Sequence, residues 1–248
     1  MIELCGLTRR FGPKTAVSNL DLQVPSGELF AFLGPNGAGK TTTIKMMVGL
    51  LQPTEGAARI CGFDVRTQTR EANLRTGYVP DQPYLYEKLS GREFLNFVSQ
   101  LYGMPASCAA KSIAEQIETF ELGRFVDDLA ESYSHGMKQR LVFASSLVHS
   151  PEVLIVDEPM VGLDPRSMRL VKDLLRAKVN GGMTVFMSTH TLAIAEEIAD
   201  RIGVVANGKL LFLGTVAQLR TQLSSDESLE QLFLTLTEEA MDNGHADR

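Results

Sequence analysis

The stretch "LFAFLGPNGAGKTTTIKMMVGLL", Leu29 to Leu51, decides the fold. It opens with five apolar residues, a run that is typical of a short strand covered on both faces. A glycine-rich loop follows, and then a helical segment that we expect to end at Gln52 and Pro53. A strand, a glycine loop and a helix in this order open a parallel α/β unit.

The loop from Gly34 to Thr41 matches the pattern G-x-x-x-x-G-K-[ST] in full. Its glycines let successive backbone N–H groups turn inward around phosphate oxygens, and the helix that follows directs its positive dipole end at the same anion. Lys40 is expected to reach the β- and γ-phosphates, and the Thr41 hydroxyl to ligate Mg²⁺. The pattern therefore predicts a site for a nucleoside triphosphate.

Two later strands are expected to complete this site. In "VLIVDEP", Asp157 follows four apolar residues, at the strand end where open α/β sheets place their ligands. Asp157 would hold Mg²⁺ through water, and Glu158 would orient and deprotonate an attacking water. His190 ends "TVFMSTH" at the same sheet edge and is expected to face the γ-phosphate. No catalytic role is assigned to His135, His149 or His245.

Composition narrows the class of protein further. The chain has 248 residues, of which 44% are hydrophobic, so it can bury a sizeable core. Its net charge of −6 argues against a sequence-independent nucleic-acid binder. The three cysteines show no metal-ligand spacing, and we expect them to be reduced thiols. No signal-peptide layout is visible and no apolar run approaches the roughly 20 residues that span a bilayer, so we expect no membrane crossing.

The middle of the chain changes to helical periodicity. Ser90 and Glu93 have capping-box spacing ahead of an apolar face, a second amphipathic stretch runs to Phe120, and a third begins near Gly136. Strand-type sequence returns after Ser150, and Asn207-Gly208 predicts a hairpin turn. A last amphipathic helix is expected through Leu229, Leu232, Phe233 and Leu236.

Together these motifs resemble the ATP-binding subunit of an ABC transporter over nearly the whole chain. "GPNGAGKTTT" is similar to the Walker A loop, "YSHGMKQR" stands at the signature position, "LIVDEP" is similar to Walker B, "VGLDP" to the D-loop and "STH" to the switch histidine. The resemblance implies an α/β P-loop NTPase with a mixed or parallel central sheet, an N-terminal antiparallel β subdomain and an inserted α-helical subdomain. The implied boundaries are 1–88 and 151–214 for the ATP-binding core, 89–150 for the helical signature subdomain, and 215–248 for a C-terminal helical extension with a frayed tail.

The resemblance also implies roles for individual residues. Phe11 would stack on adenine, and the signature residues of one subunit would close over the ATP held by the other in a head-to-tail dimer. The expected ATP contacts are Phe11, Gly34, Pro35, Asn36, Gly37, Ala38, Gly39, Lys40, Thr41, Thr42, Ser134, Gly136 and Asp164. The expected catalytic residues are Lys40, Glu158 and His190, and the expected Mg²⁺ ligands are Thr41, Asp157 and either Asp81 or Gln82.

Two motifs depart from the family pattern. The signature usually reads Leu-Ser-Gly-Gly-Gln, but Tyr133, His135 and Met137 replace three of its residues. If the first glycine needs a positive φ, histidine tolerates that conformation less well. In "YVPDQPYLY" the family's Mg²⁺-contacting glutamine corresponds to Asp81, with Gln82 one residue later. Both offer hard oxygen ligands, so the sequence does not choose between them.

The resemblance implies an ATP hydrolase, with ATP and Mg²⁺ as cofactors, that powers a separately encoded membrane permease. The motif forms look like those of ABC-2-like exporters. The resemblance then implies a homodimer that lies at the inner face of the cell membrane as a peripheral protein and binds no nucleic acid. An ABC ATPase acting on ribosomes or DNA is the alternative, but such proteins usually carry two ATP domains, a coiled coil or basic arms. A nucleotide kinase or GTPase would leave "YSHGMKQR" unexplained.

Overall fold

The computed structural model of the protein describes residues 1–221 and residue 231. The helix predicted through Leu229, Leu232, Phe233 and Leu236 lies outside the described residues, as does His245. The described strands are β1 Ile2–Phe11, β2 Lys14–Val24, β3 Leu29–Leu33, β4 Glu55–Ile60, β5 Phe63–Asp64, β6 Thr76–Val79, β7 Val153–Val156, β8 Thr184–Thr189, β9 Arg201–Ala206 and β10 Lys209–Gly214. The described helices are α1 Lys40–Met47, α2 Thr69–Asn73, α3 Gly91–Leu101, α4 Ala106–Thr119, the 3₁₀ turn Ala130–Ser132, α5 His135–Leu147, α6 Pro165–Asn180, α7 Leu192–Ile198 and α8 Val216–Arg220.

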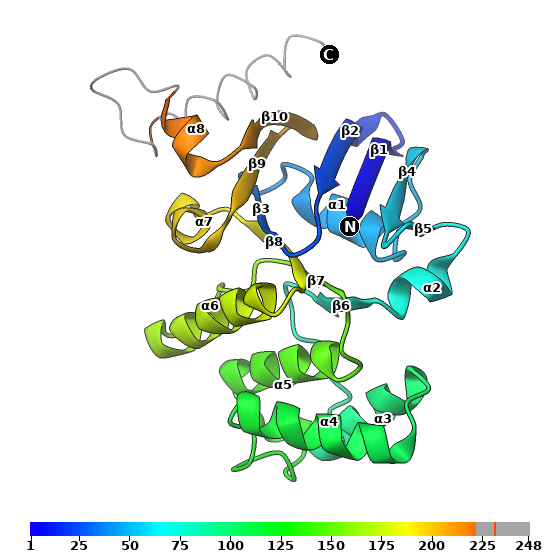
Figure 1. The fold of residues 1–248 in the computed structure, drawn as a ribbon, viewed down its shortest axis with the longest axis vertical. Helices are drawn as coiled ribbons and strands as arrows, with labels where there is room; N and C mark the ends of the chain where they lie inside the picture. The colour runs from blue at the N-terminus through cyan, green and yellow to red at the C-terminus, as the bar shows by residue number, and fades with distance from the viewer. Residues whose placement is uncertain (222–230, 232–248) are drawn as a thin grey trace.

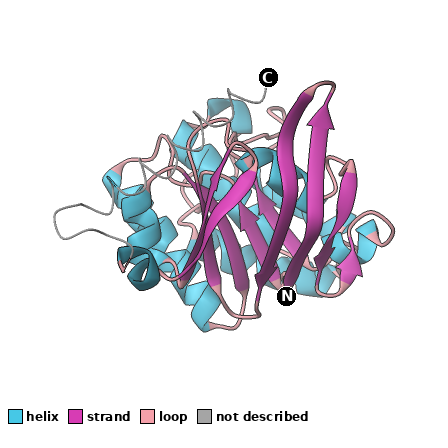
Figure 2. Cartoon of the chain, turned by 90° about the horizontal axis from the view of Figure 1, so that it is seen from above, coloured by secondary structure: helices cyan, strands magenta, loops and turns pink. Residues whose placement is uncertain are grey.

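The strands form two sheets (Figures 1 and 2). The larger sheet has the order β10-β9-β3-β8-β7-β6, and the strands from β9 to β6 run parallel, with β10 added antiparallel at one edge. The smaller sheet, β2-β1-β4-β5, is antiparallel and comes mostly from the N-terminal segment. The predicted fold class, a mixed central sheet with an N-terminal antiparallel part and inserted helices, is confirmed.

Strand β3 lies inside the larger sheet, and its alternating side chains enter two different cores. Phe30 and Phe32 pack with α1 and the antiparallel sheet, whereas Leu29, Ala31 and Leu33 pack with the helices on the other face. All five residues are 0% exposed. Because both faces are covered, the strand carries no polar alternation, which is why its sequence is continuously apolar.

Helices α3, α4 and α5 follow one another between β6 and β7 and lie together below the sheets in Figure 1. The predicted capping box at the start of α3 is confirmed. The Glu93 N–H donates to Ser90 Oγ at 3.3 Å, and the Ser90 N–H donates to Glu93 Oε2 at 2.8 Å. The third predicted helix begins at His135, one residue before the expected Gly136, because Ser134 caps it.

Local sequence signals predicted the turn between β9 and β10 correctly and the end of α1 incorrectly. Asn207 and Gly208 both have positive φ, at 47° and 74°, so the predicted hairpin turn between β9 and β10 is confirmed. The predicted end of α1 at Gln52 and Pro53 is wrong. The helix stops at Met47, because Gly49 takes a φ of 77° and ends the helical backbone earlier.

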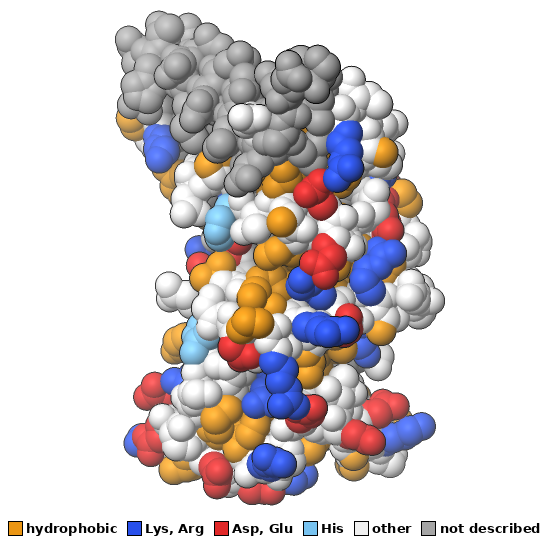
Figure 3. Space-filling view, turned by 90° about the vertical axis from the view of Figure 1, so that its left-hand side faces the viewer, with side chains coloured by type: hydrophobic (Ala, Val, Ile, Leu, Met, Phe, Trp, Pro, Cys, Tyr) orange, Lys and Arg blue, Asp and Glu red, His pale blue; other side chains and the backbone are white. Residues whose placement is uncertain are grey.

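Figure 3 shows the side of the molecule that carries α6 and α7, where Lys and Arg side chains lie between apolar patches. Within the described residues, no helix has the length and apolar character needed to cross a membrane.

His149 follows α5 and links the helical region to the sheet. Its Nε2 lies 3.1 Å from the Thr76 carbonyl of β6, a geometry in which the neutral ring donates, and the ring stacks on Tyr102 with centroids 3.6 Å apart. Its Nδ1 is buried and has no hydrogen-bond partner in the part of the chain that the structure describes. Burial lowers the pKa of His149 to about 4, and the hydrogen bond to Thr76 offsets only part of this decrease.

His149 should therefore make the protein acid-sensitive. The unfolded chain takes up a proton at its ordinary pKa of 6.5, whereas the folded chain takes it up only near 4, so the free energy of unfolding should fall as the pH drops through this interval. Urea melts at about pH 7.5 and about pH 5 measure this loss. His149→Gln keeps a donor for Thr76 and should reduce the difference, and an equal difference in both proteins would contradict the assignment.

Candidate active site

The glycine-rich loop joins β3 to α1, and two of its glycines are required for different steric reasons. A Cβ on Gly34 would lie 2.2 Å from the Val205 carbonyl oxygen. Gly39 has a φ of 104°, and a Cβ there would lie 2.5 Å from the Ala16 carbonyl oxygen. The other loop residues predicted to contact ATP are Pro35, Asn36, Gly37 and Ala38, and Thr42 follows in the first turn of α1. The backbone therefore turns tightly at the start of a helix, as an anion-binding loop must.

Lys40 begins α1 and directs its side chain back into the loop. It is only 5% exposed, and Nζ donates to the carbonyl oxygens of Gly34 at 2.7 Å and Pro35 at 3.1 Å. The same ammonium lies 3.2 Å from Glu158 Oε1. This contact is an ion pair without an aligned hydrogen bond, because Glu158 Oε1 is buried and has no hydrogen-bond partner among the described residues. The buried cation thus lies between the loop and the carboxylate predicted to be catalytic.

Glu158 connects three parts of the chain. Its Oε1 faces Lys40 of α1, its Oε2 lies 2.9 Å from His190 Nδ1 after β8, and its N–H donates to Ser188 Oγ at 2.9 Å. Its φ of 48° is unusual for a residue other than glycine and is held by these contacts. The structure therefore brings together Lys40, Glu158 and His190, which the sequence had predicted from three separate motifs.

Asp157 lies at the end of β7 and is fully buried, at 0% exposure. Its Oδ1 accepts from Ser188 Oγ, and its Oδ2 has no partner within the described residues. Burial raises the pKa of Asp157, the hydrogen bond from Ser188 and the nearby Thr41 hydroxyl lower it, and the charges of Asp81 and Glu158 raise it again. A buried carboxylate with a free oxygen is a costly arrangement unless a cation approaches it, so the geometry fits a divalent cation.

The protein would supply few of the ligands of Mg²⁺ at this site. No group of three or more His, Cys, Asp or Glu side chains within the described residues could hold a metal by itself. Mg²⁺ commonly binds through one or two protein ligands together with substrate phosphates, so Asp157 and the Thr41 hydroxyl suit it.

Ser188 is the residue of the site that sequence reasoning missed. It is 0% exposed, donates to Asp157 Oδ1 and accepts from the Glu158 N–H, so one hydroxyl orients both acidic residues. A signal was present, because Ser188 and His190 are two residues apart in "STH" and point to the same side of an extended chain.

Asp81 and Gln82 follow β6 in an exposed segment. The charge of Asp81 raises the pKa of Asp157 and contributes to the raised pKa of Tyr78. Asp81 therefore lies within electrostatic reach of the acidic end of β7, which the sequence could not establish.

The signature stretch begins α5. The exposed Ser134 is the N-cap and accepts from the Met137 N–H at 3.3 Å. His135 has a helical backbone and is absent from the described residues with positive φ, so its replacement of glycine strains nothing. No described contact joins Ser134 or Gly136 to Lys40. The His135 ring lies beside Gly162, where an added Cβ would be 3.3 Å from His135 Nε2.

Asp164 and Phe11 have local contacts besides their predicted nucleotide roles. Asp164 caps α6 by accepting from the Arg166 and Ser167 N–H groups. The hydrogen bond from the Ser167 hydroxyl, followed by these backbone bonds, lowers the pKa of Asp164. Phe11 ends β1 with 46% of its surface exposed, and the Arg9 guanidinium lies 4.5 Å from its ring centroid.

A phosphate loop, a buried lysine and an acid pair at the carboxyl ends of parallel strands define a nucleoside triphosphatase of the P-loop class. The chain belongs to the ABC transporter family, which matches residues 17–161. The inserted helices and the capped signature stretch at the start of α5 are what distinguish it from a simple kinase or GTPase fold.

Known proteins agree with this assignment. The chain is 41% identical to the daunorubicin/doxorubicin resistance ATP-binding protein of Streptomyces peucetius over 91% of its own length and 68% of the relative's. A solved ATP-binding subunit of an ABC transporter superposes with a TM-score of 0.88 and 30% identity, covering 96% of this chain and 99% of that one. A dimeric ATP-binding cassette with bound ADP and Pi superposes with a TM-score of 0.80 and 25% identity, covering 87% and 99%.

The family predicted from the motifs is confirmed, and with it the ATP hydrolase activity and the place of the chain as an ATP-binding subunit of a transporter. The alternative of an ABC ATPase acting on ribosomes or DNA is not favoured.

Proposed function

We propose that the chain powers export through a separately encoded permease, as one half of a head-to-tail homodimer at the inner face of the cell membrane. The S. peucetius relative is named for drug resistance, which export of a drug would provide. The dimeric cassette is a structural relative over nearly its whole length. The observation that carries the proposal is an exposed aromatic surface on the helical region, described below.

The catalytic proposal assigns one task to each side chain. Lys40 exchanges its bonds to Gly34 and Pro35 for the β- and γ-phosphates. Glu158, held by His190 and by the Ser188 hydroxyl, orients the attacking water and accepts its proton. Mg²⁺ would be held by Thr41 and Asp157. Asp81 would join them as a ligand, because its charge already acts on Asp157. Bound there, Mg²⁺ would neutralise charge on the phosphates.

The dimer follows from what one chain lacks. Ser134 offers a hydroxyl and Gly136 lies at the positive end of α5, but neither has a described contact with the Lys40 cluster. In the head-to-tail arrangement these two groups would reach the nucleotide held by the other chain, with Asp164 nearby. One protomer would thus contribute half of each of two sites.

An exposed, mainly aromatic surface lies along α3 and the segment just before it. It consists of Tyr84, Tyr86, Phe97 and Leu101, which are 80%, 52%, 37% and 69% exposed. The Tyr86 ring lies 6.5 Å from that of Tyr84 and 5.5 Å from that of Phe97, both edge to face. Clustered exposed aromatics mark interaction sites, and a cytoplasmic helix of a permease has the apolar face that would cover them.

Replacing Phe97 or Leu101 by Glu should detach the chain from its permease. The charge would be desolvated at an apolar contact, and we expect at least about tenfold less chain to copurify with the multi-spanning protein encoded beside it. ATP binding by the free chain should be unchanged, because neither residue is near Lys40.

Leu50→Glu is the matched control, since Leu50 is 66% exposed but follows α1, outside the aromatic surface. An equal loss with the control, or failure of the unaltered chain to copurify, would rule out this surface as the permease site.

A further inference from the structure

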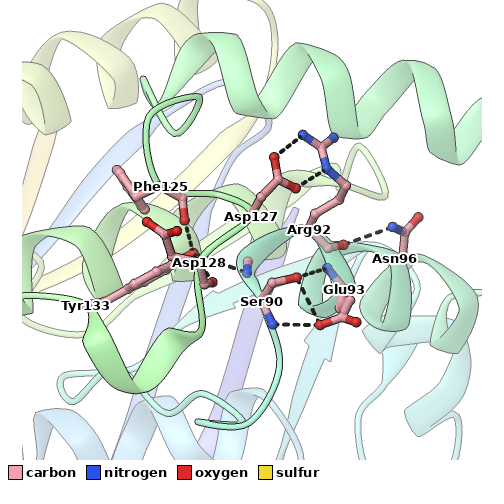
Figure 4. Close-up of polar contacts among 9 residues, drawn as sticks. Ser90, Arg92, Glu93, Asn96, Phe125, Asp127, Asp128 and Tyr133 are labelled. Carbon is pink, nitrogen blue, oxygen red and sulfur yellow. Dashed lines mark hydrogen bonds and ion pairs between the residues drawn. The ribbon is translucent and has the colours of Figure 1, made fainter.

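Tyr133, the residue before the signature serine, has its hydroxyl among three backbone groups (Figure 4). The side chain is 6% exposed, and its hydroxyl accepts from the Gly91 N–H at 3.2 Å. The O–H lies 2.6 Å from the Phe125 carbonyl oxygen and 3.2 Å from that of Asp128, and donates most directly to the nearer one. The ring meets that of Phe125 edge to face at 4.9 Å. One side chain thus joins the start of α3, the segment after α4 and the start of α5.

The start of α3 and the segment after α4 are also joined by backbone hydrogen bonds. The Arg92 N–H donates to the Val126 carbonyl at 2.8 Å, and the Ala130 N–H donates to that of Leu89 at 2.9 Å. The Arg92 guanidinium adds a two-pronged ion pair to Asp127, at 2.7 and 3.1 Å. Residues 125–133 are therefore fixed to the first turn of α3, and Tyr133 is the last point of attachment before Ser134.

Gly91 shows that the hydroxyl shapes its surroundings. Gly91 does not have a positive φ, so its backbone does not by itself require glycine. A Cβ at this position, however, would lie 2.7 Å from the Tyr133 hydroxyl oxygen and 3.1 Å from the Val126 carbonyl oxygen. The residue that opens α3 is thus small enough to admit the hydroxyl and close enough to bond it.

The aromatic surface shares α3 with the Tyr133 anchor, because it lies along this helix and the segment just before it. Tyr86 is three residues before Leu89, and its ring lies 6.3 Å from that of Phe94 in the first turns of α3. A permease helix that moved Tyr86 and Phe97 would move α3, and with it the Tyr133 anchor. Ser134 follows Tyr133 directly, so the displacement reaches the group that would contact the other chain's ATP.

We propose that the Tyr133 hydroxyl is a positioning group that fixes Ser134 relative to α3, and so links the aromatic surface to ATP hydrolysis in the dimer. The inference rests on the proposed two-chain function. Tyr133 does not touch the nucleotide and acts through Ser134. An apolar residue of similar size would fill the space but would leave the Gly91 N–H and the Phe125 carbonyl without this partner.

Tyr133→Phe tests the hydroxyl alone. Loss of its hydrogen bonds should lower kcat about fivefold and weaken ATP-driven dimerisation of the Glu158→Gln chain by a similar factor. ATP affinity of the monomer, measured by titrating ATP at low protein concentration, should stay the same. Tyr102→Phe is the matched control, because Tyr102 lies at the other end of α3 with its ring on His149. A purely structural role would lower the Tm but leave kcat and dimerisation unchanged well below that Tm, which would overturn the proposal.

Gly91→Ala tests the same contact from its other side. On its own it should push the hydroxyl away and lower kcat as Tyr133→Phe does. Introduced into Tyr133→Phe it should cost much less, since the oxygen that its Cβ would strike is gone. Equal costs in both backgrounds would overturn the proposal. If the Glu158→Gln chain itself fails to dimerise with ATP, the proposed two-chain function is wrong, whereas a normal dimer that is indifferent to Tyr133→Phe refutes the positioning role alone.

Discussion

Glu158→Gln should abolish ATP turnover while the protein still binds ATP. Glu158 is the carboxylate that contacts both Lys40 and His190, and an amide cannot accept a proton from water at neutral pH. Loss of a general base costs on the order of 10² to 10⁴ in rate, so phosphate release should fall to near background. Lys40 would also lose its negative neighbour and become freer to bind phosphate, so ATP affinity should rise or stay equal.

The same variant should accumulate as an ATP-bound dimer, because hydrolysis is the step proposed to reopen it. Sedimentation with ATP and with ADP would show a dimer in the first case and a monomer in the second. Glu152→Gln is the control, since Glu152 is an exposed acid just before β7 that pairs with Arg75. A Glu158→Gln protein that stays monomeric at saturating ATP would contradict the two-chain mechanism, and one that hydrolyses ATP normally would contradict the assignment of the base.

The sequence predicted the features that depend on neighbouring residues. The continuous apolar run of β3 indicated a strand covered on both faces, and two separate cores cover it. The capping box at Ser90 and Glu93 involves residues three apart, so its geometry is contained in the local sequence. The end of α1 is also a local feature, but the prediction placed it at the proline, whereas the positive φ of Gly49 ends the helix earlier.

The parts that the sequence missed are contacts between distant segments. Ser188 is 31 residues from Asp157, and Tyr133 is 42 residues from Gly91. The spacing of Ser188 from His190 indicates which side of the strand the serine faces but not its two acidic partners, and no local pattern distinguishes a tyrosine in a signature position from an ordinary buried residue. Likewise, only the helical backbone of His135 shows that histidine replaces the signature glycine without strain.

Lys40→Ala should remove most of the affinity for the triphosphate. Hydrogen bonds to charged groups contribute about 1.5 to 3 kcal/mol, and Lys40 would make more than one to the phosphates, so we expect ATP to bind about 10²-fold more weakly. The substitution also leaves Glu158 Oε1 buried without its cation, which adds a repulsive charge at the γ-phosphate. Both effects act in the same direction, and hydrolysis should be lost with binding.

The readout for Lys40→Ala is the rise in Tm that ATP gives to the folded protein, because a ligand that binds only the folded state stabilises it by RT ln(1 + [L]/Kd). Lys45→Ala is the matched control, since Lys45 lies on the same helix but is exposed. The control should keep the full ATP-dependent rise, and Lys40→Ala should lose nearly all of it. Because Lys40 also bonds the Gly34 and Pro35 carbonyls, the ligand-free Tm of each variant must be measured first. An unchanged rise in Lys40→Ala would mean that the buried ammonium holds the loop together but does not bind phosphate, and the loop could then not be the ATP site.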